Sequence, residues 1–204
     1  MKLYCSPPMA SLGVLILAYE MGTPITLAEM DAETRRMADG RPLAEINPKN
    51  CLPVLERDDG SVITETAVML DWLAAQDPQL RFTAACHSET HLRIMEWMVY
   101  FATEQHKLYT FLFWSIDDTA KAAFQQRIID RFALAERTLA SSDYLVGNRY
   151  TIADIYLLLM VRGAMHLFSD FNLETDFPHL ADHRKRLRAR PAVERAAADH
   201  GGGV

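Results

Sequence analysis

The three cysteine thiols are the first side chains that could do chemistry, because a thiolate is both a nucleophile and a metal ligand. Cys5, Cys51 and Cys86 are widely spaced along the chain and form no Cys-x-x-Cys pair. An odd set without such a pair argues against a disulfide framework and against a zinc site. We therefore expect a protein of a reducing compartment, the cytoplasm, that binds no metal.

A second group of polar side chains lies where a helix is predicted to begin, at Glu65 and Thr66. The first N–H groups of a helix have no partner within the helix, so they can receive an anionic carboxylate. Thr66 can donate its hydroxyl, and Glu65 can accept from an ammonium group. Simple helix capping is the structural alternative, and both interpretations can hold at once.

The elements that carry these residues in the first part of the chain are short and well marked. A strand at 2–5 ends at Ser6-Pro7-Pro8, and apolar residues at helical spacing predict a helix that stops at Gly22. A second strand follows at 25–30. Asp59-Gly60 between two apolar runs predicts a β-hairpin, and a helix opens at 64–66. The order β-α-β-α-β-β-α is that of a thioredoxin-like α/β domain ending near residue 78.

From about Ser88 onward the pattern changes to long helices without strand signals. One helix face is marked by residues 92, 95, 99, 102 and 106, and a second helix by 124, 128, 132 and 139. Thr151 and Asp154 have the spacing of a capping box, which assigns Asp154 to folding rather than to chemistry. We predict a first domain at 1–78, a linker at 79–87 and an all-helical domain at 88–204.

Composition excludes several other classes of function. The formal net charge of −6 gives no basic footprint for nucleic acid, and half of the 204 residues are hydrophobic, which is enough for a sizeable core. The apolar stretch 12–18 lacks the charged flank and cleavage site of a secretory signal. No other stretch is long and apolar enough to span a bilayer, so we expect neither nucleic acid nor a membrane as partner.

Four segments together resemble the soluble glutathione transferases, with the bacterial beta class the best match. They are KLYCSPPMASL at the start, EINPKNCLPVLERDDGSVITE in the middle, EWMVYFATEQHK in the first long helix and VGNRYTIADIYL in a later one. The spacing of these segments is matched over nearly the full length. The resemblance implies glutathione as co-substrate and a homodimer whose third and fourth helices form the cleft between subunits.

The resemblance also implies how glutathione would be held. It implies a cis peptide bond before Pro53 that turns the backbone of Leu52 outward to pair with an extended peptide, although an ordinary strand-entry proline is the alternative. Glu65 and Thr66 would then take the γ-glutamyl end. Cys51 stands where the family commonly has glutamine and could form a mixed disulfide. Arg35 and Lys107 are candidate partners for the carboxylates.

The residues expected to face the glutathione thiol differ from those of the family. Beta-class members typically carry a cysteine at the position of Ala10. Ser11, at the start of the first helix, is the best remaining donor to a thiolate, with helix capping as the alternative and Ser6 as a second candidate. His106 could donate to the thiolate or polarise the electrophile, although a lone histidine on an apolar face is more often a packing residue.

The sequence therefore predicts a glutathione transferase that joins the glutathione thiolate to a small hydrophobic electrophile. Ser11 and His106 are the predicted catalytic residues. Loss of the usual cysteine favours an alternative, a glutathione-binding protein with little or no turnover, because fold alone never establishes activity. Glutathione-dependent reduction or peroxidase activity is a third option, since it needs only a bound thiol.

Overall fold

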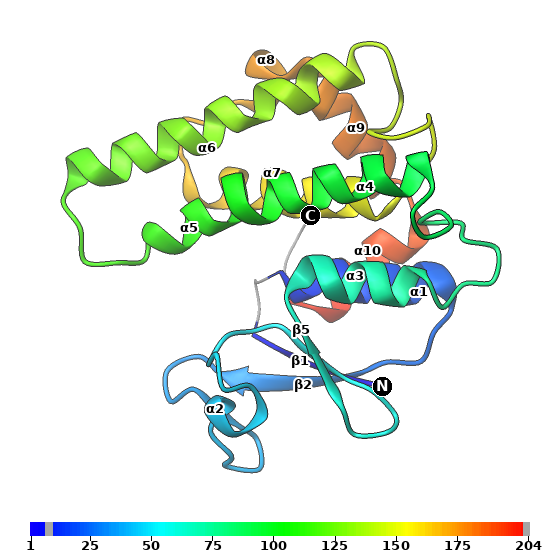
Figure 1. Ribbon diagram of the computed structural model, residues 1–204. Coiled ribbons are helices and arrows are strands. Elements are labelled where there is room, and N and C mark those ends of the chain that lie inside the picture. The colour runs from blue at the N-terminus through cyan, green and yellow to red at the C-terminus, as the bar shows by residue number, and fades with distance from the viewer. Residues whose placement is uncertain (7–9, 202–204) are drawn as a thin grey trace. The chain divides into compact units, whose positions relative to one another are not determined.

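The computed structural model describes residues 1–6 and 10–201 (Figure 1), so the predicted proline loop at 7–8 and the last three residues lie outside the described part. The chain forms two compact units. The first comprises Met1–Gln79 together with Arg190–Val204, and the second comprises Leu80–Ala189. Each unit is described by itself below.

The first unit is built on a five-stranded sheet in the order β3-β2-β1-β4-β5. Its strands are β1 (Lys2–Cys5), β2 (Thr26–Asp31), β3 (Arg36–Met37), β4 (Val54–Glu56) and β5 (Val62–Thr64). β1 and β2 are parallel, and the other neighbours are antiparallel. The predicted hairpin is present between β4 and β5, with Gly60 at φ 81°, a value that glycine adopts readily. The two-residue β3 was not predicted.

Helices α1 (Ser11–Met21) and α3 (Thr66–Ala74) lie on one side of the strands, and the short α2 (Leu43–Ile46) lies on the other (Figure 1). Every residue of α1 from Ser11 to Ala18 is buried. The helix ends as predicted at Gly22, whose φ of 68° is the left-handed C-cap conformation. On the far side, Leu43 of α2 packs with Tyr4 and Val54, and this cluster holds the loop before β4 against the sheet.

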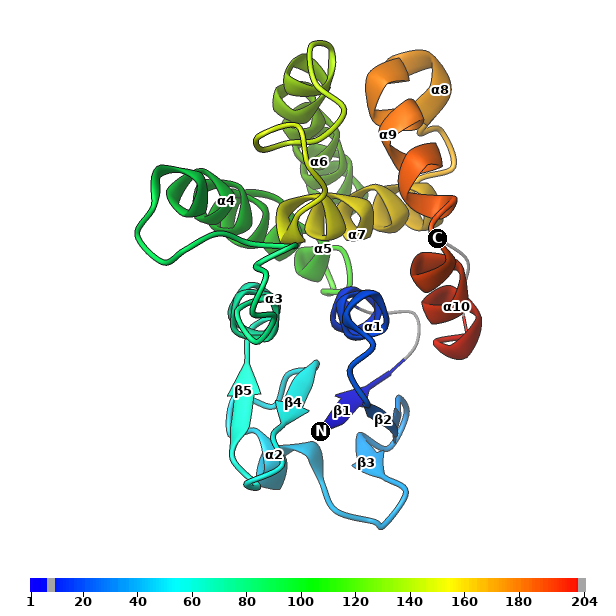
Figure 2. The same ribbon diagram turned by 90° about the vertical axis from the view of Figure 1, so that its right-hand side faces the viewer.

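The last helix, α10 (Pro191–Asp199), belongs to the first unit and lies beside α1 (Figure 2). The carboxylate of Glu20 receives two hydrogen bonds from the Arg190 guanidinium, at 2.5 and 2.9 Å. The Tyr19 hydroxyl donates to Asp199 at 2.7 Å. Residues after 189 were predicted to belong to the helical domain at 88–204, but they pack on α1 and group with the first unit instead of lying outside the predicted domain 1–78. Residues 80–87, predicted as linker, group with the helical unit.

The second unit is helical, as predicted. It contains α4 (Glu89–Tyr100), a π-helical turn η1 (Phe101–His106), α5 (Lys107–Phe111), α6 (Asp118–Leu139), α7 (Ile152–Leu167), α8 (Leu173–Asp176) and α9 (Pro178–Arg188). α4, η1 and α5 follow one another without a break in the helical backbone (Figure 1). α7 is buried on every side from Ile152 to Val161, and it forms the core of the unit.

The apolar face of α4 that was predicted from residue spacing is largely exposed to solvent rather than packed against the core. Leu92 and Val99 are 47% and 53% exposed, and the buried residues are Ile94 and Met98 instead. Leu92, Val99 and their neighbours line an open groove of about 600 Å³. The helix carries two apolar faces, and periodicity alone does not say which of them meets the core.

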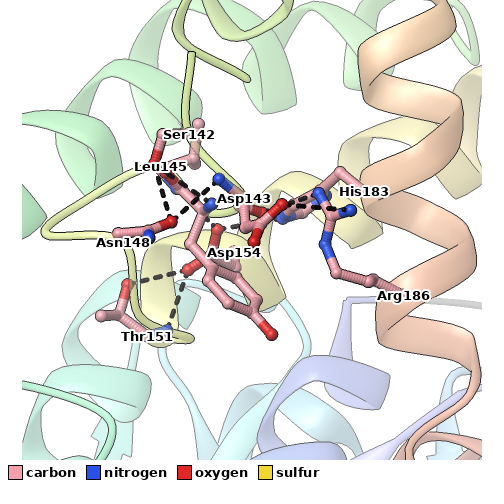
Figure 3. Close-up of polar contacts among 9 residues, drawn as sticks. Ser142, Asp143, Leu145, Asn148, Thr151, Asp154, His183 and Arg186 are labelled. Carbon is pink, nitrogen blue, oxygen red and sulfur yellow. Dashed lines mark hydrogen bonds and ion pairs between the residues drawn. The ribbon is translucent and has the colours of Figure 1, made fainter. Parts of the chain in front are cut away.

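The predicted capping box is present at the start of α7, and its acidic residue is the centre of a buried polar cluster (Figure 3). One Asp154 oxygen accepts from the Thr151 N–H at 2.9 Å. The other accepts from the Leu145 N–H at 2.9 Å and lies 2.9 Å from His183 Nε2. Asp154 and His183 are almost fully buried, so this carboxylate ties a loop and α9 to the central helix.

The fold is the predicted one, a thioredoxin-like unit and an all-helical unit. Within residues 1–6 and 10–201, the helices are all too short or too polar to cross a bilayer.

Candidate active site

Leu52 and Pro53 lie at the same end of the sheet as Glu65 and Thr66. The β4–β5 register pairs Val54 with Thr64, so continuing it one or two residues brings these four positions to one edge. The Leu52–Pro53 peptide bond is cis, which is the conformation that the resemblance implies. Leu52 is half-buried and Pro53 is buried.

The loop that leads into this edge is held from inside by Asn47, which is 2% exposed. Its amide Nδ2 donates to the Cys51 carbonyl at 2.7 Å, and its Oδ1 accepts from the Lys49 N–H at 3.1 Å. From outside, an Nη2 of the exposed Arg35 donates to the Asn50 carbonyl at 2.6 Å. Arg35 thus buttresses the loop with part of its guanidinium.

At the start of α3 a cation and an anion meet. Lys49 Nζ donates to Glu65 Oε1 at 2.7 Å and to Thr64 Oγ1 at 2.9 Å. Glu65 has φ 70°, an uncommon backbone conformation for a side chain other than glycine, and Thr66 follows as a buried first residue of the helix. Both charged side chains are more than half exposed, so their pairing contributes little to stability and is open to exchange for a ligand's charges.

The start of α1 is arranged differently from the prediction for Ser11. Its side chain has no exposed surface, and its Oγ lies 2.6 Å from Nε2 of His200, which follows α10. Ser6 is also buried, and Ala10 keeps an intermediate exposure. The Ser11 hydroxyl is therefore buried and bonded to His200 rather than exposed.

The three thiols differ in environment. Cys5 is fully buried in β1, and burial, with the charge of Glu29, raises its pKa to about 11. Cys51 is exposed, and its Sγ donates to the Lys49 carbonyl at 3.3 Å. Cys86 is also exposed, in the helical unit. Cys51 is therefore the accessible thiol of the first unit within its described residues.

His106 and Lys107 lie in the second unit. His106 ends the π-helical turn, an irregularity found frequently at functional sites, and its Nδ1 lies 2.9 Å from the Tyr156 hydroxyl. Lys107 is exposed, with Nζ 5.8 Å from the centre of the Phe111 ring. The remaining predicted residues share the first unit: Ser11, Arg35, Cys51, Leu52, Pro53, Glu65 and Thr66.

Comparison with known proteins gives the family. Residues 10–76 match the N-terminal domain of glutathione S-transferase, and residues 104–198 match its C-terminal domain. The chain is 31% identical to glutathione S-transferase GstA of Escherichia coli O157:H7 over 98% of its own length and 99% of that protein. This chain belongs to the glutathione S-transferase family.

Solved glutathione S-transferases share the fold over nearly the whole chain. A sphingomonad enzyme complexed with glutathione is 29% identical with a TM-score of 0.91, over 98% of this chain and 99% of that one. The bacterial beta-class enzyme of Sphingomonas chungbukensis is 27% identical with a TM-score of 0.91, over the same shares. The chain is accordingly a glutathione transferase with beta-class neighbours, as the resemblance implied.

Three residues that shape the candidate site of this transferase were not predicted from the sequence. Lys49 and Asn47 stand inside the segment that carried the resemblance, and the Asn-Pro-Lys sequence was the available signal. His200 gave no signal, because nothing in the spacing of Ser11 and His200 brings residues 189 positions apart together. In the described part of the chain no cluster of three or more His, Cys, Asp or Glu side chains could hold a metal ion.

Proposed function

We propose that this transferase conjugates the glutathione thiolate to small hydrophobic electrophiles, with glutathione held by the first unit. One observation carries the proposal. Lys49, Glu65 and Thr66 gather at the first turn of α3, beside the edge where Leu52 precedes β4. An acceptor, a cation and free helix N–H groups at one edge complement the ammonium and carboxylate of a γ-glutamyl group.

Binding would use these groups in separate roles. The γ-glutamyl carboxylate would accept hydrogen bonds from the first N–H groups of α3 and from the Thr66 hydroxyl. The ammonium of the same γ-glutamyl group would bind the Glu65 carboxylate. The Leu52 backbone would pair with the extended peptide as an added strand does. Arg35 and Lys107 would attract the carboxylates through their exposed charges.

The chemical step needs the thiol as a thiolate. A free thiol has a pKa near 8.5, and each unit of depression requires about 1.4 kcal/mol of preferential thiolate stabilisation. The start of α1 offers the positive end of a helix dipole. Because Ser11 is buried against His200, Ser11 would support this helix start from inside, and His106 would be the side chain that donates to the thiolate or polarises the electrophile.

Apolar side chains for the second substrate are present on the helical unit. Phe113 and Trp114 follow α5 and are 74% and 56% exposed, and the Trp114 ring lies 4.7 Å from that of Phe111. Exposed aromatic rings of this kind would concentrate an apolar electrophile. The thiolate would attack its electrophilic carbon, forming the C–S bond as the leaving group departs with its electron pair.

We also propose that the protein is a homodimer of the cytoplasm. The support for a dimer is the open groove along α4, whose lining includes Leu92, Met95 and Val99. Exposed apolar side chains that line a groove are typical of surfaces that bind another protein.

Turnover of an aryl halide by the wild type, Ser11→Ala and His106→Ala proteins tests the proposal. We expect measurable wild-type conjugation, and we expect His106→Ala to lower kcat while glutathione affinity stays close to wild type. Tight glutathione binding with no turnover of varied electrophiles would favour the weakly catalytic alternative, to which the alanine at position 10 points. Turnover of peroxides or disulfides without conjugation would favour the reductase alternative.

A further inference from the structure

The contact between Ser11 and His200 joins the last turn of the chain's final helix to the first turn of α1. Ser11 Oγ and His200 Nε2 are 2.6 Å apart, and the two residues are 0% and 1% exposed. A buried polar pair of this kind strongly prefers to stay together, since separating it would leave both groups without water.

The pair occupies a specific place within the α1–α10 contact. The same two helices are already joined by Glu20 with Arg190 and by Tyr19 with Asp199, and the Arg195 guanidinium lies 4.2 Å from the centre of the Tyr19 ring. Those contacts involve the last turn of α1. His200 alone among them reaches the first turn, next to Ala10.

The first turn of α1 has no other side-chain cap among its described residues. Ala10 is the N-cap residue and has no side chain that can bond to a backbone N–H. A serine hydroxyl at a helix start usually turns back to a backbone N–H. Here the hydroxyl is held by the imidazole, whichever ring nitrogen carries the proton, and the Gly13 N–H donates to the Ala10 carbonyl at 3.1 Å.

We propose that His200 is a positioning residue for the thiol end of the glutathione site. By holding Ser11, it fixes the first turn of α1, so that the backbone N–H groups at the start of the helix are preorganised toward the thiolate. The final segment of the chain thereby contributes to the chemistry without touching the ligand. This inference rests on the proposed function, because it assumes that glutathione binds with its sulfur at the start of α1.

The test compares His200→Ala, His200→Gln and Ser11→Ala with the matched control Tyr19→Phe. The control removes the hydrogen bond between Tyr19 and Asp199 from the contact between α1 and α10. It keeps an aromatic ring at position 19 beneath the Arg195 guanidinium. The readout is the pKa of the bound glutathione thiol, from the ultraviolet absorbance of the thiolate against pH. Calorimetry with glutathione and with S-methylglutathione, which has no ionisable thiol, separates thiolate stabilisation from binding of the rest of the tripeptide.

We expect His200→Ala and Ser11→Ala to reduce the ionisation constant of the bound thiol about three- to tenfold, the usual weight of one hydrogen bond. S-methylglutathione affinity should stay within about twofold of wild type. Adding Ser11→Ala to His200→Ala should have no further effect, because the bond between the two side chains is already absent. His200→Gln, whose amide can still bond to Ser11, should recover part of the loss, and Tyr19→Phe should leave the thiol pKa unchanged.

An unchanged thiol pKa in His200→Ala and Ser11→Ala that still bind glutathione would overturn the inference. So would equal losses for glutathione and S-methylglutathione, which would show a merely structural role. If His200→Ala does not fold, His200→Gln and Ser11→Ala carry the same comparison. Failure of the wild type to bind either ligand would instead contradict the proposed function.

Discussion

At the scale of single residues, environment separates side chains of one type. The three cysteines look alike in the sequence, yet Cys5 is buried in the sheet while Cys51 and Cys86 are exposed. The serine at position 11 is a good donor by its type and place, and its burial against His200 changes what it can do. Residue type thus sets the chemistry that is available, and contacts decide which part of it is used.

Labelling of the native protein with a thiol reagent should distinguish the cysteines. We expect modification of Cys51 and Cys86 and protection of Cys5, because reagents need access to the sulfur. Incubation with oxidised glutathione should place a mixed disulfide on Cys51 in preference to Cys86, which serves as the exposed control. Mass spectrometry of peptides measures both. Equal adducts on the two exposed cysteines would remove any special role for Cys51.

The Cys5 thiol should also make stability depend on pH in the alkaline range. Its pKa rises from 9.0 to about 11 on folding, so the unfolded chain loses this proton first. The stabilisation is complete below pH 9.0 and is lost as the pH rises to about 11. The free energy of unfolding of the wild type should therefore fall more steeply over this range than that of Cys5→Ala. Parallel slopes for the two proteins would contradict this.

At the scale of elements, turn residues, helix-capping residues and the periodicity of apolar residues predict most of the helices and strands of the first unit. Gly22 ends α1, Asp59-Gly60 forms the hairpin turn, and the start of α3 lies where Thr66 indicates. Local signals of this kind act through the backbone of neighbouring residues, so they can be read from the sequence. The π-helical turn before His106 and the choice of buried face on α4 depend on packing against distant helices, and no local pattern revealed them.

Asp154 offers a test of the element that the sequence predicted best. Asp154→Ala should lower the free energy of unfolding by about 3 kcal/mol or more, since it leaves buried N–H groups and His183 without their acceptor. Asp117→Ala removes an exposed N-cap from α6 and should cost only about 1 kcal/mol. Urea unfolding measures both. Similar losses in the two variants would contradict a central role for the buried cluster.

At the scale of the whole molecule, the sequence predicted two units and their fold classes. It did not predict that residues after 189 pack on α1, because the Glu20–Arg190 pair and the Ser11–His200 bond join distant parts of the chain. The same reason explains which contacts of the candidate site could be predicted from the sequence. Leu52, Glu65 and Thr66 are joined by a short hairpin, so the sequence could predict that they lie close together. The contact of His200 with Ser11 could be seen only in the structure.

The open face of α4 predicts how copies of the chain associate. Val99→Asp places a charge in the groove and should convert a wild-type dimer to a monomer, because an unpaired charge is costly to bury. Leu134→Asp makes the same change at a partly exposed position of α6 outside the groove, and it should leave the dimer intact. Sedimentation velocity gives the oligomeric state. A dimer that survives Val99→Asp would place the contact elsewhere.

Calorimetric titration with reduced glutathione will show whether the first turn of α3 and the edge at Leu52 hold this tripeptide. We expect a saturable heat for the wild type and an affinity at least about tenfold lower in Glu65→Gln. Glu45→Gln makes the same charge change at an exposed residue of α2 and should keep the wild-type affinity. No heat at millimolar glutathione, or an affinity in Glu65→Gln equal to wild type, would contradict it.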